Sequence, residues 1–152
     1  MRQPKATSRS PLRAVLDTNV FVAAFLARRP ESPTRELLNR WRQNEFELLY
    51  SDDLLVEIVE KLHQKGFSER LIASFVVEFR DGATFVGVSP NAVRAVIAAD
   101  PDDDLVLACA VAGKATHLVT YDPHFAVLGG EYEGVAIVDA LTFLHVLRQS
   151  VH

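Results

Sequence analysis

Short apolar runs alternate along the chain with longer segments in which apolar residues recur every three or four positions. The short runs predict strands, and the longer segments predict helices with one apolar face. The alternation predicts an α/β fold with a mostly parallel sheet covered on both faces. The expected strands are residues 13–16, 46–50, 84–88, 117–120 and 135–138. The expected helices are residues 20–27, 34–42, 51–66, 68–79, 103–112 and the segment after Asp139, with one or two further helical turns in 91–99.

The chain has 152 residues, the size of one compact domain. Its one cysteine, Cys109, excludes an internal disulfide and a cysteine-based zinc cluster. The longest apolar run, residues 105–112, falls well short of the roughly 20 residues that cross a membrane. Residues 1–11 are basic and lack the apolar stretch of a secretion signal. We therefore expect one cytoplasmic domain over residues 12–150, preceded by a disordered basic tail and without a membrane partner.

Charge is distributed unevenly along the chain. Residues 1–42 hold nine basic and three acidic side chains, a balance of +6, which leaves −10 for the rest of a chain whose net charge is −4. Solvated helix faces and a basic tail would explain this pattern. That is the simpler explanation, and the pattern also suits a protein that binds phosphates while holding a cation.

Acidic residues follow two of the predicted strands. Asp17 comes directly after residues 13–16, and Asp122 comes just after 117–120. If these strands are neighbours, both carboxylates lie at the carboxyl edge of the sheet, where ligands bind in folds of this class. Asp102, Asp103 and Asp104 could supply a third group. Carboxylates held this close repel one another unless a cation neutralises them, and Mg²⁺ or Mn²⁺ suits oxygen ligands.

Each of these acids also has a purely structural interpretation. Asp17 could cap a helix, Asp122 before Pro123 could start a turn, and Asp102 and Asp103 could stabilise a helix N-terminus. Asp104 is harder to explain in this way, because eight apolar residues follow it. In the helix after Ser51, periodicity does not choose between Glu57 and Glu60 as a site residue.

Four short segments carry these acids. They are Leu16-Asp17-Thr18-Asn19-Val20, Ser51-Asp52-Asp53-Leu54-Leu55-Val56-Glu57, Asp104-Leu105-Val106-Leu107-Ala108-Cys109-Ala110 and Thr120-Tyr121-Asp122. In their order and spacing they resemble the motifs of the PIN-domain nucleases. The resemblance is closest to the VapC-like toxins of bacterial toxin–antitoxin pairs, and it covers residues 12–145.

The resemblance implies a three-layer α/β/α fold and hydrolysis of RNA that depends on Mg²⁺ or Mn²⁺ and leaves a 5′-phosphate and a 3′-hydroxyl. It also implies a small antitoxin protein as partner and is compatible with a homodimer. The catalytic, metal-binding residues that it implies are Asp17, Glu57, Asp104 and Asp122, which selects Glu57 over Glu60. The supporting residues that orient ligands or bind phosphate are Thr18, Asn19, Ser51, Asp102 and Thr120.

Two expectations go beyond the four motifs. The basic N-terminal third suggests that RNA approaches over Arg28, Arg29, Arg40 and Arg42. The family often has a second aspartate two places after the last motif acid, where this chain has His124. Its side chain either reaches the rim of the carboxylate site, where its nitrogen would favour Mn²⁺ over Mg²⁺, or lies in an exposed loop, so the preferred metal depends on where it lies.

Other functions fit the sequence less well. An aspartyl-phosphate phosphatase needs an acid where this chain has Asn19, a receiver domain needs paired early acids and a late lysine in its own pattern, and no glycine-rich phosphate loop exists. A PIN-like module that binds RNA or protein without catalysis remains an alternative. Loss of a motif acid would be its expected signature, and all four are present.

Overall fold

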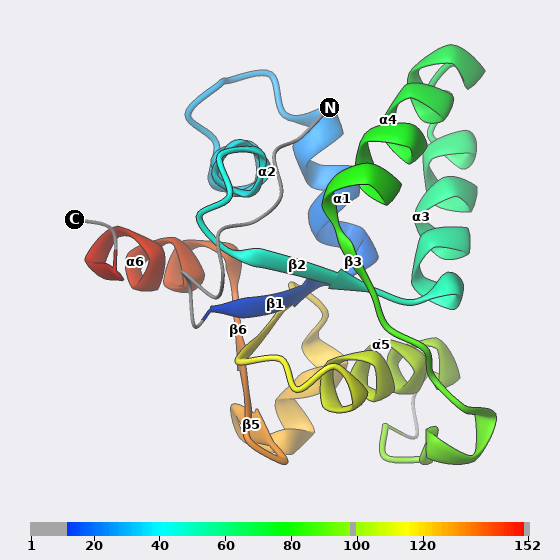
Figure 1. Ribbon diagram of the computed structural model, residues 1–152, viewed down its shortest axis with the longest axis vertical. Helices are drawn as coiled ribbons and strands as arrows, with labels where there is room; N and C mark the ends of the chain where they lie inside the picture. The colour runs from blue at the N-terminus through cyan, green and yellow to red at the C-terminus, as the bar shows by residue number, and fades with distance from the viewer. Residues whose placement is uncertain (1–11, 98–99, 151–152) are drawn as a thin grey trace.

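The computed structural model describes residues 12–97 and 100–150, so the predicted tail at residues 1–11 lies outside the described residues. A six-stranded sheet with the strand order β3-β2-β1-β4-β6-β5 forms its centre (Figure 1). Every neighbouring pair is parallel except β5 and β6, which are antiparallel. The strands are β1 (Arg13–Leu16), β2 (Glu47–Tyr50), β3 (Thr84–Phe85), β4 (His117–Val119), β5 (Glu131–Tyr132) and β6 (Val135–Val138).

Helices cover both faces of this sheet, which confirms the predicted three-layer α/β/α architecture. In Figure 1, the first four helices lie on one side of the sheet and α5 lies on the other. The sixth helix contacts α2 and β4. The helices are α1 (Thr18–Leu26), α2 (Pro33–Arg42), α3 (Asp52–Gln64), α4 (Glu69–Gly82), α5 (Pro101–Ala112) and α6 (Ala140–Ser150), with short 3₁₀ turns η1 (Pro90–Ala92) and η2 (Pro123–Leu128).

Local sequence signals place the ends of these helices. The hydroxyls of Ser32, Ser51 and Ser68 each accept a hydrogen bond from a backbone N–H three residues later, which caps α2, α3 and α4. Gly113 ends α5 where the helix meets the sheet. A Cβ atom at this position would lie 2.9 Å from Val86 Cγ2 and 3.0 Å from Leu49 Cδ1, so only glycine lets the end of the helix approach these side chains so closely.

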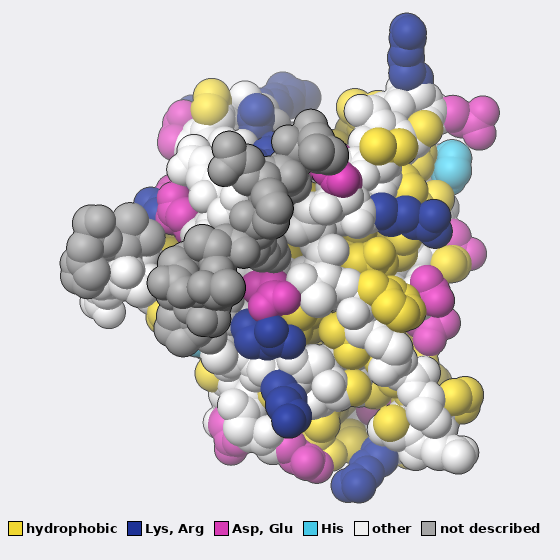
Figure 2. All heavy atoms as spheres, in the orientation of Figure 1, with side chains coloured by type: hydrophobic (Ala, Val, Ile, Leu, Met, Phe, Trp, Pro, Cys, Tyr) yellow, Lys and Arg dark blue, Asp and Glu magenta, His cyan; other side chains and the backbone are white. Residues whose placement is uncertain are grey.

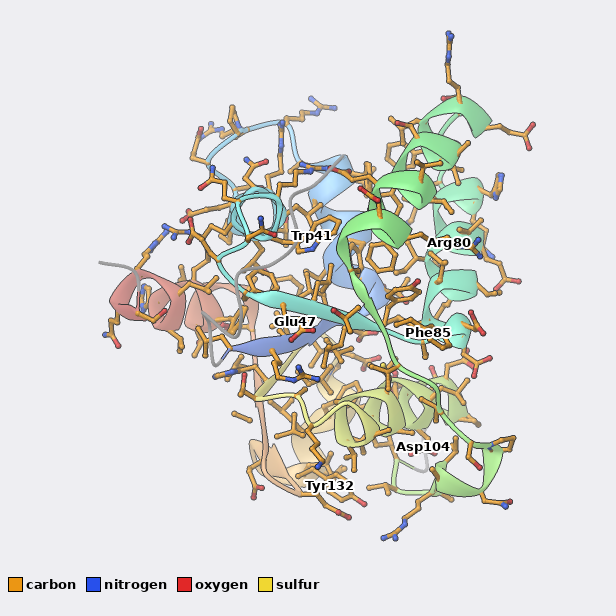
Figure 3. All side chains as sticks on the ribbon, in the orientation of Figure 1. Trp41, Glu47, Arg80, Phe85, Asp104 and Tyr132 are labelled. Atoms are coloured by element: carbon orange, nitrogen blue, oxygen red, sulfur yellow. The ribbon has the colours of Figure 1, made fainter. Side chains whose placement is uncertain are left out.

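The core lies on both sides of β1, whose Ala14, Val15 and Leu16 are fully buried. On the side of α1 and α4, Phe21 and Phe79 pack edge to face with ring centroids 5.4 Å apart. Figure 3 shows Trp41 beside this cluster, and its ring centroid lies 5.9 Å from that of Phe79. The apolar runs therefore form a sheet buried on both faces, as parallel strands require.

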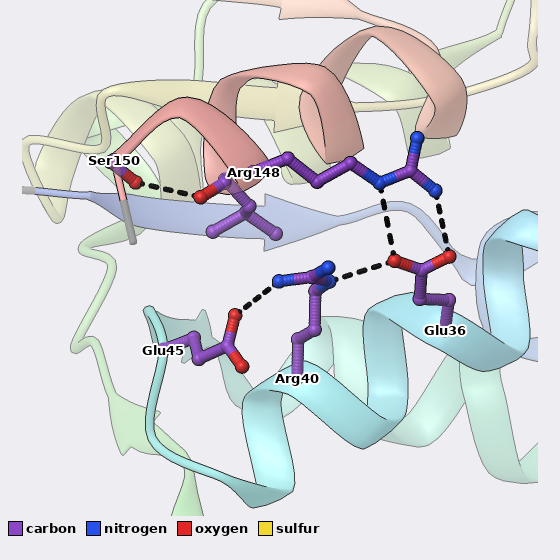
Figure 4. A network of polar contacts seen from close by, with 6 residues as sticks. Glu36, Arg40, Glu45, Arg148 and Ser150 are labelled. Atoms are coloured by element: carbon purple, nitrogen blue, oxygen red, sulfur yellow. Dashed lines mark hydrogen bonds and ion pairs between the residues drawn. The ribbon is translucent and has the colours of Figure 1, made fainter. Parts of the chain in front are cut away.

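Helix α6 is held to the rest of the domain by an ion-pair network (Figure 4). Arg148 on α6 donates to Glu36 on α2, and Glu36 also accepts from Arg40. Arg40 in turn pairs with Glu45 in the loop before β2. The buried Phe143 of α6 also packs edge to face on Phe46, with ring centroids 5.2 Å apart. The C-terminal helix is thus part of the core.

The structure differs from the predicted elements mainly at the edges. Strand β3 is two residues long instead of five, the described part of the predicted helical segment, residues 91–97, gives only the end of the turn η1, and the short antiparallel β5 was not expected. Figure 2 shows apolar side chains gathered over the end of α4 and over β3, where Phe85 is 53% exposed. Such a short edge strand offers little backbone for pairing with another chain.

The order of the strands also fixes where a ligand can bind. From β1 the chain proceeds outward to β2 and β3, and it then returns to β4 on the other side of β1. The crevice at the carboxyl ends of β1 and β4 is therefore the switch point of the sheet. Within the described ranges, the helices are too short or too polar to cross a membrane.

Candidate metal centre

Asp17 lies at the carboxyl end of β1 and begins α1. Its backbone N–H donates to the Val119 carbonyl of β4, which fixes it at the switch point. One carboxylate oxygen accepts from the Thr18 N–H at 2.8 Å, and the other accepts from the Thr120 hydroxyl at 2.8 Å. Asp17 is therefore both the helix cap and an oriented carboxylate, only 4% exposed.

Two further carboxylates meet Asp17 at this point. Asp103 comes from the first turn of α5, and Asp122 comes from the segment after β4. Ligand oxygens of Asp17, Asp103 and Asp122 all lie within 4.8 Å of one another. Thr120 links Asp17 to Asp122, because its hydroxyl donates to the Asp17 carboxylate and accepts from the Asp122 N–H at 2.9 Å.

His124 reaches the rim of this cluster. Its Nδ1 lies 3.0 Å from Asp103 Oδ2 and 3.2 Å from Asp122 Oδ1. A second group of three ligand atoms within 4.8 Å consists of Asp100, Asp103 and His124. Of the two alternatives that the sequence left open for this histidine, the structure favours the rim of the site.

Glu57 approaches the cluster through Thr18. The Thr18 hydroxyl, on the residue after Asp17, donates to Glu57 Oε1 at 2.6 Å, which ties α3 to the start of α1. Glu57 and the exposed Asp102 line a hollow of about 170 Å³ between α3 and α5. Glu57 is thus connected to the cluster, although it is not one of the three carboxylates that meet there.

Crowding and burial act strongly on these acids. Burial raises the pKa of Asp17 to about 6, although hydrogen bonds from Thr120 and Thr18 oppose the shift. Burial also raises the pKa of Asp103 to about 6, against the opposing contact with His124. Burial raises the pKa of Glu57 as well. The contact with Asp103 raises the pKa of His124. Burial thus disfavours the charged forms of Asp17 and Asp103, and a cation bound between them would stabilise those charged forms.

Asp104 does not join the cluster, contrary to the sequence-based expectation. Its Oδ1 accepts hydrogen bonds from the backbone N–H groups of Val96 and Ile97 at 3.0 and 2.8 Å. Figure 3 shows it directed from α5 toward the segment that leads from β3 into this helix. Successive helical residues point about 100° apart, so only one of two neighbouring aspartates can face the sheet edge. Asp103 is that residue.

Three predicted supporting residues also lie outside the cluster. The Ser51 hydroxyl caps α3 by accepting from the Leu54 N–H. Asn19 is exposed on the first turn of α1, and Asp102 borders the hollow beside Glu57. Thr18 and Thr120 are the two predicted supporting residues that hold carboxylates of the site.

The four predicted arginines fall into two pairs. The guanidinium of Arg40 is bound by Glu36 and Glu45, and that of Arg42 is bound by both carboxylate oxygens of Glu78. Arg28 and Arg29 are exposed after α1, and no ion pair engages either within the described residues. Only this second pair is free to meet a phosphate, because the ion pairs of the first pair would have to break.

Asp100 was not predicted as a ligand, Asp103 was only one of three aspartates that could supply a third carboxylate, and His124 was left between the rim of the site and an exposed loop. Helix α5 is apolar on nearly every side, so the hydrophobic pattern does not indicate which face meets the sheet edge. Helical spacing gives no further signal, because Val106 and Ala110 on the side of Asp103 are buried and so are Leu107 and Ala108 on the side of Asp104.

The donor set fits a hard divalent cation. Three carboxylates from three segments converge, and each is oriented by hydroxyl, amide or imidazole groups. Oxygen ligands of this kind suit Mg²⁺ or Mn²⁺, and few protein ligands leave positions for water and for a phosphate oxygen. Asp17, Asp103 and Asp122 would hold such an ion, with His124 and Glu57 beside them.

Known proteins share both the sequence pattern and the fold. The PIN domain family matches residues 13–124. A chain of VapBC2 from Rickettsia felis, solved with a DNA fragment from their promoter, superimposes with a TM-score of 0.59 at 18% identity. The match covers 83% of this chain and 97% of that chain. Among curated proteins, no sequence matches. Because the family pattern spans most of the chain and includes β1, α3, α5 and β4, this protein is a member of the PIN-domain family.

Proposed function

We propose that the protein is a divalent-metal-dependent endoribonuclease and the toxin of a toxin–antitoxin pair. The observation that carries the proposal is the convergence of Asp17, Asp103 and Asp122 at the switch point of the sheet. The pKa values of Asp17 and Asp103 are raised, and acids with a raised pKa in such a crevice are typical of functional sites. Membership of the PIN family makes phosphodiester hydrolysis the reaction that best fits them.

The chain's own residues have defined parts in this reaction. The bound cation would polarise the phosphate and lower the pKa of a coordinated water. Water adds to phosphorus, the bond to the 3′ oxygen breaks, and the water's proton is transferred to that oxygen. The carboxylates of Asp17, Asp103 and Asp122 would hold the cation whose positive charge this step needs. Thr120 orients Asp17, and Thr18 orients Glu57 toward the same region.

RNA is the substrate that the surroundings of the site support. The hollow beside Asp122 has a volume of about 340 Å³ and is lined by Tyr121, whose side chain is 48% exposed. An exposed aromatic ring can stack on an unpaired base. Arg28 and Arg29 follow the end of α1 that is opposite to Asp17, where they offer exposed positive charge for phosphates farther along the RNA.

The toxin assignment rests on the motif resemblance and on the fold shared with the VapBC2 chain. A toxin of this class acts in the cytoplasm and requires a small antitoxin protein to restrain it. Expression of the wild-type chain alone should therefore arrest growth, and coexpression of a small protein encoded next to it should restore growth. Arrest by Asp17→Asn as strong as by wild type would contradict the proposal.

Cleavage of single-stranded RNA tests the enzymatic part directly. Wild type should cleave with Mg²⁺ or Mn²⁺ and stop in excess EDTA, and Asp17→Asn should fold normally by circular dichroism yet fail to cleave. Glu69→Gln is a suitable control, because Glu69 is 93% exposed on α4. Full activity in EDTA or in Asp17→Asn would refute the assignment and favour the non-catalytic module.

A further inference from the structure

His124 is held in place by its own backbone as well as by its ring. Its N–H donates to Asp122 Oδ1 at 2.9 Å, directly after Pro123, and its Nδ1 lies 3.2 Å from the same oxygen. The ring is 41% exposed, while its Nδ1 is turned inward to the buried Asp103. The imidazole therefore has a fixed direction toward the carboxylates.

The carboxylates near His124 form two overlapping donor groups. Asp17, Asp103 and Asp122 make up the first, an all-oxygen group, and Asp100, Asp103 and His124 make up the second. Asp103 belongs to both groups. A cation held by Asp103 therefore lies within reach of further carboxylates and of an imidazole nitrogen.

The separations between these donor atoms are those of ligands on one cation. Adjacent ligands of an octahedral ion with metal–ligand distances near 2.1 Å are about 3.0 Å apart. His124 Nδ1 lies 3.0 Å from Asp103 Oδ2 and 3.2 Å from Asp122 Oδ1. Replacing the direct contacts by a shared cation would need little movement of the ring.

We infer that His124 is a nitrogen ligand of the divalent cation held by Asp103, and that it makes the site prefer Mn²⁺ to Mg²⁺. The inference rests on the proposed function, which requires that a divalent cation bind at these carboxylates. Mg²⁺ is a hard ion that favours oxygen ligands and water, whereas first-row transition ions gain more from an imidazole. The presence of His124 where the family often has a second aspartate would then determine which metal the site prefers.

Binding of Mn²⁺ to the purified, tag-free full chain tests this assignment without cleavage. Pulsed electron paramagnetic resonance of bound Mn²⁺ should show coupling to a directly bound ¹⁴N nucleus in wild type. The coupling should vanish in His124→Asn, which keeps a polar side chain of similar reach. It should persist in His63→Asn, because His63 lies on α3, exposed and 3.7 Å from Glu69.

Calorimetric titration gives a second readout. The ratio of the Mg²⁺ to the Mn²⁺ dissociation constant should fall at least about tenfold in His124→Asn, the lower end of the loss caused by removing even an indirect metal contact. His124→Asp should give a ratio below that of wild type, with no nitrogen coupling.

The outcomes separate the inference from the proposed function. Tight Mn²⁺ binding that Asp103→Asn abolishes, without nitrogen coupling in wild type, would overturn the ligand role of His124 and leave the proposed metal centre intact. His124 would then be only an ion-pair partner of Asp103. Failure of every divalent cation to bind wild type would refute both.

Discussion

Asp103 and Asp104 are consecutive residues of α5, yet their carboxylates serve different parts of the molecule. Asp103 meets His124 and the carboxylates of β1 and β4 at the sheet edge. Asp104 accepts the N–H groups of Val96 and Ile97 and so holds the segment that enters the helix. One turn of helix thus combines a candidate ligand with a structural anchor.

This relationship predicts opposite effects for the same chemical change at adjacent positions. Asp103→Asn should lower RNA cleavage by about 100-fold or more, because a ligand is lost. Asp104→Asn should keep cleavage within a few-fold, since its amide oxygen can still accept the two backbone bonds. Initial rates at saturating Mn²⁺ measure both. Equal losses in the two variants would contradict the assignment of Asp103.

Asp104→Leu extends this comparison to stability. The variant leaves the Val96 and Ile97 N–H groups without their acceptor, which should cost about 1–3 kcal/mol of unfolding free energy. Asp104→Asn should unfold within about 1 kcal/mol of wild type in urea. If both variants have the unfolding free energy of wild type, Asp104 does not anchor the segment that contains Val96 and Ile97.

The raised pKa of Asp17 predicts how stability depends on pH in the metal-free protein. Between pH 3.8 and about 6 the folded state keeps a proton that the unfolded state releases, so stability falls as pH rises through this range. Asparagine does not titrate, so the Asp17→Asn variant does not lose stability in this way. The unfolding free energy of the variant minus that of wild type should therefore increase by up to about 3 kcal/mol from pH 4 to pH 7.

Urea unfolding at several pH values in EDTA measures this difference. Saturating Mn²⁺ at pH 7 should stabilise wild type strongly and Asp17→Asn only weakly, because the cation neutralises the same carboxylate. Stability curves of the two proteins that run parallel from pH 4 to pH 7 would show that the Asp17 pKa is ordinary.

Thr120 should act through the orientation of its neighbours. Thr120→Val keeps the shape but removes the hydroxyl that donates to Asp17 and accepts from Asp122. We expect Mn²⁺ affinity to fall about 10- to 100-fold, as for other residues that hold metal ligands. Thr120→Ser should restore most of it. Calorimetric titration of wild type and both variants with Mn²⁺ measures these affinities. Weak Mn²⁺ binding by Thr120→Ser would indicate that packing of the threonine methyl group matters more than its hydroxyl.

The two arginine pairs should differ in their effect on RNA binding. In the Asp17→Asn background, replacing Arg28 and Arg29 by Gln should flatten the slope of log affinity against log salt by about 1.4, the value for two phosphate contacts to single-stranded RNA. Replacing Arg40 and Arg42 should leave the slope unchanged and lower stability. The reverse result would place the RNA over α2.

Much of the site was predictable because it follows local rules. Asp17 and Asp122 follow short apolar runs, and the carboxyl ends of adjacent parallel strands necessarily meet. Thr18 and Thr120 flank these strand ends, and their hydroxyls donate to Glu57 and Asp17 respectively. The strands β1 and β4 were predicted close to their observed bounds.

The incorrect expectations depended on three-dimensional contacts. Pattern alone could not orient a helix that is apolar on nearly all sides, so Asp104 was predicted in place of Asp103. The pairing of Arg42 with Glu78 joins residues far apart in sequence, and no local signal reveals it. Strand β5 has only two residues, too few for a period-2 pattern to be visible.

The position of β6 has a consequence for anyone who shortens this protein. The family match ends at residue 124, but β6 follows it and pairs with β4 in the interior of the sheet. In a fragment that ends at residue 124, β4 would become an edge strand, and the backbone groups of His117, Leu118 and Val119 that face β6 would be unpaired. An exposed edge strand of this kind pairs with strands of other molecules, so the fragment should form aggregates even though it retains Asp17, Asp103, Asp122 and His124.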